Sequence, residues 1–284
     1  IYIPPKNIKI HQYAFSYCNN LKNVEFSNDT NSLIIEENIF AFSSVEKITI
    51  PSDTIFKDRW CCGIDEIKDI KIIEKRNSRI KLYENQILLS KSDKNNDEYE
   101  NLVCAICDFD SLTIPPFITK ISPFAFSLCS RLVDFKFCEE SKIRKIGKDT
   151  FHFSPIESVY ISSNIIKICC NAFCYCEKLK KVVFSNKSKL KIIDNNAFNN
   201  TALESIFIPN SVTDIKNNVF KNTKNLKVID FNDKSELRYI GQFAFFNTEI
   251  CAFSIPKSVE YIDSSTFNNC KCIKIIEIQE YSSL

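Results

Sequence analysis

The residues best suited to chemistry in this 284-residue chain are its 14 cysteines. Cys104 and Cys107 form one CxxC pair, which is half of a zinc site, but no second CxxC or HxxxH pair follows at ligand spacing. Cys169, Cys170 and Cys174 form a second concentration of thiols. Thiols can also form disulfides or act as redox groups, depending on the compartment. Because the spacings support no metal site, we expect neither a metal nor a cofactor.

Groups that could serve as a catalytic base are sparse. His11 and His152 are the two histidines, and they lie many repeats apart. Nucleophilic catalysis by a thiol or hydroxyl needs such a base beside the nucleophile. No spacing forces two carboxylates together, so a glycosidase-type dyad has no support. We therefore expect no enzymatic activity.

The charge balance argues against other classes of partner. The chain has 37 Lys and Arg residues against 35 Asp and Glu residues, and its net charge of +2 gives no electrostatic reason to expect a nucleic-acid partner. The longest apolar stretches, such as 102–106, are far shorter than the roughly 20 residues of a membrane-spanning helix, so we expect no membrane insertion by these residues. The chain has no Met and begins at Ile1. We expect the natural protein to extend beyond both ends.

A repeat built around phenylalanine organises the chain. Its members follow two interleaved series with a step of 47 residues, namely Phe126, Phe173, Phe220 and Phe267, and Phe151, Phe198 and Phe245. Each of these residues, called the repeat Phe below, follows Ala or another short residue. Apolar residues at every second position precede it, as in Ile206 and Ile208. That alternation is typical of a strand with one buried face.

The alternation predicts eleven such strands, or rungs. Their last apolar residues are Phe26, Ile50, Ile72, Ile114, Phe137, Ile161, Phe184, Ile208, Phe231, Ile255 and Ile278. A unit of about 23 residues cannot bury its own apolar face, so neighbouring units must stack on one shared core. We predict an α/β solenoid with a parallel β-sheet on one face and short helical turns on the other.

Three segments carry a family resemblance. Residues 208–215 (IPNSVTDI), 125–129 (AFSLC) and 179–184 (LKKVVF) resemble the BspA-like leucine-rich repeat family of bacterial and protozoan surface-type proteins. The resemblance covers nearly the whole chain. It implies a single curved leucine-rich-repeat solenoid over residues 1–284, serving protein recognition or adhesion. A shared fold does not identify the partner.

The repeat is interrupted once. The rungs ending at Ile72 and Ile114 are separated by 42 residues, and segments 86–91 and 101–106 inside this interval are strand-like. We predict a β-hairpin insertion at about 80–107. It is either a local packing variant or a dedicated functional feature.

Four cysteines share one position of the repeat. Phe15 and Phe40 extend the repeat toward the N-terminus. Cys18, Cys129, Cys176 and Cys270 each lie three residues after a repeat Phe, where other units carry Ser43, Thr201 or Thr248. A position that accepts Cys, Ser or Thr requires a small side chain with weak hydrogen-bonding ability. We predict structural thiols here rather than disulfides.

The outward side chains of the sheet form the candidate ligand-binding site. Tyr160, Val183 and Phe207 fall on three successive rungs, and Val228 extends the row diagonally. Equivalent positions on neighbouring rungs lie about 4.8 Å apart. Exposed apolar residues on a concave sheet are typical of a protein-binding hot spot. Aromatic and β-branched residues also stabilise sheets wherever they lie, and both interpretations stay open.

The resemblance favours a non-catalytic recognition or adhesion module at the cell surface or outside the cell. Its partner would be a protein ligand, such as a host-surface or matrix protein. One alternative is an intracellular scaffold that uses the same face in the cytoplasm, which free thiols would favour. A third, from another class, is a cysteine-based metal or redox protein. Elemental analysis and thiol titration would separate it from the other two.

Overall fold

The computed structural model describes residues 1–4, 8–29, 33–57, 59–60, 67–75, 78–91, 98–106, 109–127 and 129–278. Every regular element within these ranges is a β-strand. The chain divides into two compact units, which we describe separately. Unit 1 comprises Ile1–Asp110 and Ile118–Leu132, and unit 2 comprises Ser111–Phe117 and Val133–Leu284. The single solenoid over residues 1–284 stays a prediction.

Unit 1 contains two parallel sheets. The main sheet has the order β1 (Tyr2–Ile3), β3 (Asn23–Phe26), β5 (Lys47–Pro51), β7 (Asp69–Ile73). The second sheet has the order β2 (Lys9–Ile10), β4 (Ile34–Ile35), β6 (Ile55–Phe56). Val24, Phe26, Ile48 and Ile50 are buried, and the residues between them face outward, as the alternation predicts.

The predicted hairpin is present in unit 1 and has one more strand than expected. β9 (Ile87–Ser90) pairs antiparallel with β10 (Asn101–Ala105). β8 (Ile80–Tyr83) also pairs antiparallel with β9, through a turn whose central residues Glu84 and Asn85 have φ angles of 50° and 52°. Tyr83 pairs with Ile87, so the loop has three residues, and the Gln86 amide donates to the Tyr83 carbonyl at 3.0 Å. Positive φ angles at both central residues of this β-turn indicate type I′. β12 (Lys120–Ile121) joins β10 in parallel, giving the order β12-β10-β9-β8.

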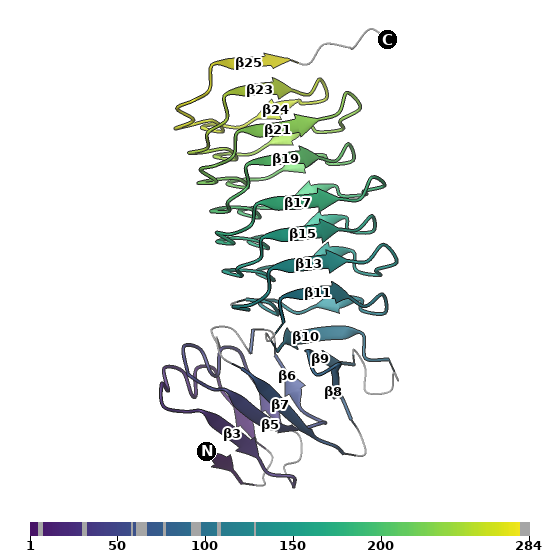
Figure 1. The fold of residues 1–284 in the computed structure, drawn as a ribbon, viewed down its shortest axis with the longest axis vertical. Helices are drawn as coiled ribbons and strands as arrows, with labels where there is room; N and C mark the ends of the chain where they lie inside the picture. Colours follow the sequence, from purple (N-terminus) through teal and green to yellow (C-terminus); the bar gives the residue numbers. More distant parts are fainter. Residues whose placement is uncertain are drawn as a thin grey trace. The chain divides into compact units, whose positions relative to one another are not determined.

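Unit 2 stacks its main strands in sequence order, from teal to yellow in Figure 1. They are β11 (Ser111–Ile114), β13 (Asp134–Phe137), β15 (Ser158–Ile161), β17 (Lys181–Phe184), β19 (Ser205–Ile208), β21 (Val228–Phe231), β23 (Ala252–Ile255) and β25 (Ile275–Ile278). Hydrogen bonding joins them as β11-β13-β15-β17, β19-β21 and β23-β25. With β3, β5 and β7 of unit 1, they confirm the eleven predicted rungs within the described residues.

A second parallel sheet of unit 2 is continuous. It contains β14 (Lys145–Ile146), β16 (Lys167–Ile168), β18 (Ile192–Ile193), β20 (Asp214–Ile215), β22 (Tyr239–Ile240) and β24 (Tyr261–Ile262). The second residue of each strand from β14 to β22 is a fully buried Ile. Each turn of unit 2 therefore buries apolar side chains from two sheets in one core.

Stacked phenylalanine rings fill the core of unit 2. Phe173 stacks on Phe198 with ring centroids 5.2 Å apart, and Phe198 on Phe220 with centroids 5.6 Å apart. Phe151 and Phe245 continue the stack in the two directions. Because each ring packs against the rings of the turns before and after it, every turn depends on its neighbours for burial.

The predicted helical turns are absent from the described residues, and this expectation was wrong. The residues two before and two after a repeat Phe are left-handed, as at Asn171 (φ 56°) and Tyr175 (φ 59°) around Phe173. The same holds around Phe151, Phe198, Phe220, Phe245 and Phe267. Left-handed residues cannot continue a right-handed helix. The amide of Phe173 donates to the carbonyl of Ala197 in the next turn at 2.9 Å. Hydrogen bonds between turns therefore replace those of a helix.

Candidate ligand-binding surface

The four candidate residues lie on the main strands of unit 2 and face outward. Val183 on β17, Phe207 on β19 and Val228 on β21 are 37%, 49% and 45% exposed, and Tyr160 on β15 is half-buried. Their strand neighbours Val159, Ile206 and Ile208 are buried in the core. These four apolar side chains therefore point outward from strands whose other face is buried in the core.

The register brings only some of these residues directly together. Tyr160 lies opposite Val183 in the β15–β17 ladder. Phe207 lies opposite Asp230, and Val228 lies opposite Ser205, so these two are diagonal neighbours on β19 and β21. The ladder ends between β17 and β19. The structure thus forms two apolar pairs on consecutive strands, where the sequence predicted one row.

A hollow that the sequence did not predict adjoins Val228. Its volume is about 390 Å³, and Val228, Asp230, Cys251, Ala252 and Ser254 contribute to its lining. It lies where β21 and β23 belong to different hydrogen-bonded sheets. A break in the hydrogen bonding between two strands cannot be detected in the amino-acid sequence, because each strand keeps its own apolar alternation.

Charged groups border the apolar pairs. The Tyr160 hydroxyl donates a hydrogen bond to Glu139, which lowers the pKa of that carboxyl and raises the pKa of Tyr160. Partial burial pushes the pKa of Asp134 upward, but hydrogen bonds from Ser158 and Lys136 outweigh it, so that the pKa is lowered overall. At neutral pH, Tyr160 is therefore a neutral donor to the ionised Glu139 carboxylate, and Asp134 is ionised as well.

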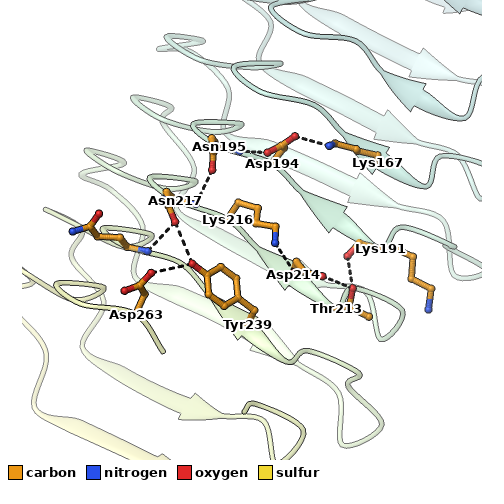
Figure 2. A network of polar contacts seen from close by, with 11 residues as sticks. Lys167, Lys191, Asp194, Asn195, Thr213, Asp214, Lys216, Asn217, Tyr239 and Asp263 are labelled. Atoms are coloured by element: carbon orange, nitrogen blue, oxygen red, sulfur yellow. Dashed lines mark hydrogen bonds and ion pairs between the residues drawn. The ribbon is translucent and has the colours of Figure 1, made fainter. Parts of the chain in front are cut away.

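A polar network follows the second sheet of unit 2 (Figure 2). Lys167 Nζ lies 2.6 Å from Asp194 Oδ2, and Asp194 Oδ1 accepts from the Asn195 amide at 2.8 Å. Asn195 Oδ1 accepts from the amide of Asn217 in the next turn at 3.0 Å. Asn217 Oδ1 then accepts from the Gln242 amide at 3.1 Å. The asparagine side chains therefore tie successive turns together through their backbones.

The carboxylates of this network are poor proton donors. Partial burial raises the pKa values of Asp194 and Asp214, but the hydrogen bonds from Lys167 and Lys216 outweigh it, so that both are lowered. A backbone hydrogen bond from Ser264, together with the Tyr239 hydroxyl at 3.0 Å, lowers the pKa of Asp263. General acid catalysis at neutral pH needs a raised carboxyl pKa, so this arrangement is suited to structure.

Four thiols of unit 2, those of Cys169, Cys170, Cys174 and Cys176, are held in their protonated form. Burial raises the pKa of Cys174 to about 12 and that of Cys176 well above its ordinary value, and it also raises the pKa values of Cys169 and Cys170. Metal binding and nucleophilic attack both require the thiolate. Among the described residues no group of three or more His, Cys, Asp or Glu side chains could hold a metal ion. Cys107 of the CxxC pair lies outside them.

The shared cysteine position behaves as predicted at two sites. Cys176 Sγ donates to the Phe151 carbonyl at 2.9 Å, and Cys270 Sγ to the Phe245 carbonyl at 3.0 Å. Thr223 makes the same contact to the Phe198 carbonyl at 3.0 Å. Cys129 contradicts the prediction because it is disulfide-bonded. A repeat position does not show which thiols approach within bonding distance after folding.

A family model decides the classification of the chain. Six copies of a BspA type leucine-rich repeat region match residues 1–85, 99–227 and 191–283. The chain belongs to the BspA-type leucine-rich repeat family. No curated protein matches this leucine-rich repeat chain. Among the described residues, no helix has the length and hydropathy needed to cross a membrane.

Solved leucine-rich repeat structures share the fold. A protein from Eubacterium ventriosum is 16% identical with a TM-score of 0.72, over 99% of this chain and 84% of that one. A leucine-rich cell surface protein from Faecalibacterium prausnitzii is 20% identical with a TM-score of 0.58, and the pneumococcal vaccine antigen PcpA is 17% identical with a TM-score of 0.53. Each match covers 99% of this chain, which spans 60% and 57% of these two proteins.

Proposed function

We propose that this leucine-rich repeat protein is a non-catalytic recognition or adhesion module, displayed on a cell surface or secreted. It would bind a protein ligand through the main-sheet face of unit 2, with Tyr160, Val183, Phe207 and Val228 as contact residues. The observation that carries the proposal is the exposure of these apolar side chains on strands whose opposite face is buried. Exposed apolar clusters with a polar rim are typical of protein-binding sites.

The family and two structural neighbours support a location at the cell surface or outside the cell. One structural neighbour is a cell surface protein and another a vaccine antigen. The disulfide at Cys129 is consistent with an oxidising compartment. The thiols that stay free, such as the exposed Cys251, favour the second candidate, an intracellular scaffold that uses the same face.

The binding face can be tested with a double variant, Tyr160→Ser with Phe207→Ser. Tyr261→Ser is a matched control, because Tyr261 is 67% exposed on β24 of the second sheet. Binding to purified matrix proteins and to cell-surface extracts is compared with binding to cytosolic extract, and circular dichroism monitors the fold. Each hot-spot side chain should contribute about 2 kcal/mol or more, about thirtyfold in Kd. Equal binding by the folded double variant and the control would refute the face.

A further inference from the structure

A hollow in unit 1 combines four cationic side chains. Its volume is about 300 Å³, and Lys57, Arg79, Lys91 and Lys120 contribute to its lining. The other polar side chains of the lining are Thr54, Ser90, Asn101 and Ser122, which are all neutral. This concentration of one sign contrasts with the whole chain, in which 37 basic residues face 35 acidic ones.

The strand register of the hairpin sheet brings these residues together. Asn101 on β10 lies opposite Ser90 on β9 and also opposite Lys120 on β12, so the three form one row across the sheet. Arg79 immediately precedes β8, and the Lys91 amide donates to its carbonyl at 3.0 Å. Lys120 is therefore at one end of this row, and Arg79 and Lys91 lie beside its Ser90 end.

Lys57 contributes from a different sheet. It follows β6, and its amide donates to the Ile35 carbonyl of β4 at 2.9 Å, which fixes the backbone at that point. Lys57 is exposed, and Arg79 is half-buried. The inserted hairpin thus supplies Arg79 and Lys91 to a hollow that the regular repeat alone would not contain.

Lys57, Arg79 and Lys120 are not neutralised within the described part of unit 1. No carboxylate there lies within 4 Å of the Lys57, Arg79 or Lys120 side-chain nitrogens. Lys91 Nζ lies 4.9 Å from the centre of the Tyr99 ring, which holds its stem beside the row. Like charges gathered in a concave site repel one another and attract an anion.

We propose that this hollow binds a sulfate or phosphate group. A tetrahedral oxyanion offers several acceptor oxygens, which match a guanidinium fork, lysine ammonium groups and the Ser90 and Ser122 hydroxyls. Its small concave form suits one such group better than a long nucleic-acid backbone. The group can be a free ion or an ester on a larger molecule, such as a sulfated polysaccharide. This activity is independent of the apolar face of unit 2.

Titration calorimetry on the full chain tests the proposal with four probes. These are inorganic phosphate, inorganic sulfate, a heparin octasaccharide and an oligothymidylate of equal charge, with the desulfated octasaccharide as a blank. We expect saturable binding of at least one of the first three, weakening as salt rises. Binding of the octasaccharide without the inorganic ions identifies a sulfated polysaccharide as the source, and the reverse identifies a free ion.

Variants connect the binding to the hollow. Arg79→Gln and Lys120→Gln should each raise the Kd of the probe that binds by about tenfold or more. Lys71→Gln is the matched control, because it removes the same charge from an exposed position on β7 of the main sheet. Its affinity should stay within about twofold of the parent. Tyr160→Ser with Phe207→Ser should also leave it unchanged, which separates this proposal from the proposed function.

Three results would overturn the proposal. The first is no saturable binding of phosphate, sulfate or octasaccharide by the folded parent chain. The second is binding that Arg79→Gln and Lys120→Gln weaken no more than Lys71→Gln does. The third is tighter binding of the oligothymidylate than of every other probe, because that result would indicate a nucleic-acid surface instead.

Discussion

Phe198→Ala removes the central ring of the phenylalanine stack in unit 2. The Phe198 side chain is fully buried, and it packs nearly parallel to Phe173 and Phe220, at interplanar angles of 1° and 4°. Truncating a buried Phe to Ala costs about 3–5 kcal/mol, through lost burial and the cavity that remains. Because neighbouring turns share this contact, we expect the loss to weaken the junctions with both adjacent turns.

The measurement is urea unfolding followed by circular dichroism. Phe207→Ala is the matched control, since Phe207 is on a neighbouring segment of unit 2 but 49% exposed. The control should change the free energy of unfolding by about 0.5 kcal/mol or less. Fluorescence of Trp60, the single tryptophan, reports on unit 1, where its ring is buried. Phe198→Ala should therefore shift the circular dichroism transition more than the fluorescence transition.

Two results would refute the reasoning about the stack. One is a loss below about 1 kcal/mol for Phe198→Ala, because a fully buried ring cannot be removed so cheaply unless the cavity collapses. The other is an equal loss for Phe198→Ala and Phe207→Ala. That outcome would mean that the ring is not in the core of unit 2.

Three further predictions concern single contacts. Cys176→Ser should keep the hydrogen bond to the Phe151 carbonyl. Cys176→Val should cost about 1 kcal/mol more in thermal or urea unfolding, because that buried carbonyl loses one donor while it keeps the Ser154 amide; equal stabilities would contradict this. Asn196, left-handed at φ 57°, should tolerate Gly but lose about 1–2 kcal/mol on substitution by Val; a stable Val variant would show that the turn is not left-handed. Hydrogen bonds from Lys22 and Lys68 lower the pKa of Glu46 from 4.5 to about 2, so its ionised form stabilises unit 1 above about pH 4.5, and this contribution disappears as the pH falls toward 2. The stability difference between the parent and Glu46→Gln should therefore shrink over that range, and a difference that does not change with pH would contradict the ion pairs.

The apolar alternation and the repeat Phe were sufficient to predict the strands. The eleven rungs, the outward positions of Val183, Phe207 and Val228, and the pairing of segments 86–91 and 101–106 all follow from which side chains avoid water. Successive side chains of a strand point to opposite faces, so burial of one face requires an apolar residue at every second position of the same short segment. This period of two can therefore be recognised in the sequence of a segment without knowledge of the rest of the molecule.

Tertiary structure decided the features that depend on contacts between turns. The segments around the repeat Phe are left-handed turns because amides such as that of Phe173 find carbonyls in the next turn, which no local propensity reveals. The disulfide at Cys129, the breaks in the main ladder and the cationic hollow likewise depend on distances between segments far apart in sequence. The sequence alone determined which residues are buried and the period at which they recur. Only the folded chain determined which polar groups meet, because hydrogen bonds and charges act over a few ångströms between atoms that the sequence places 20 or more residues apart.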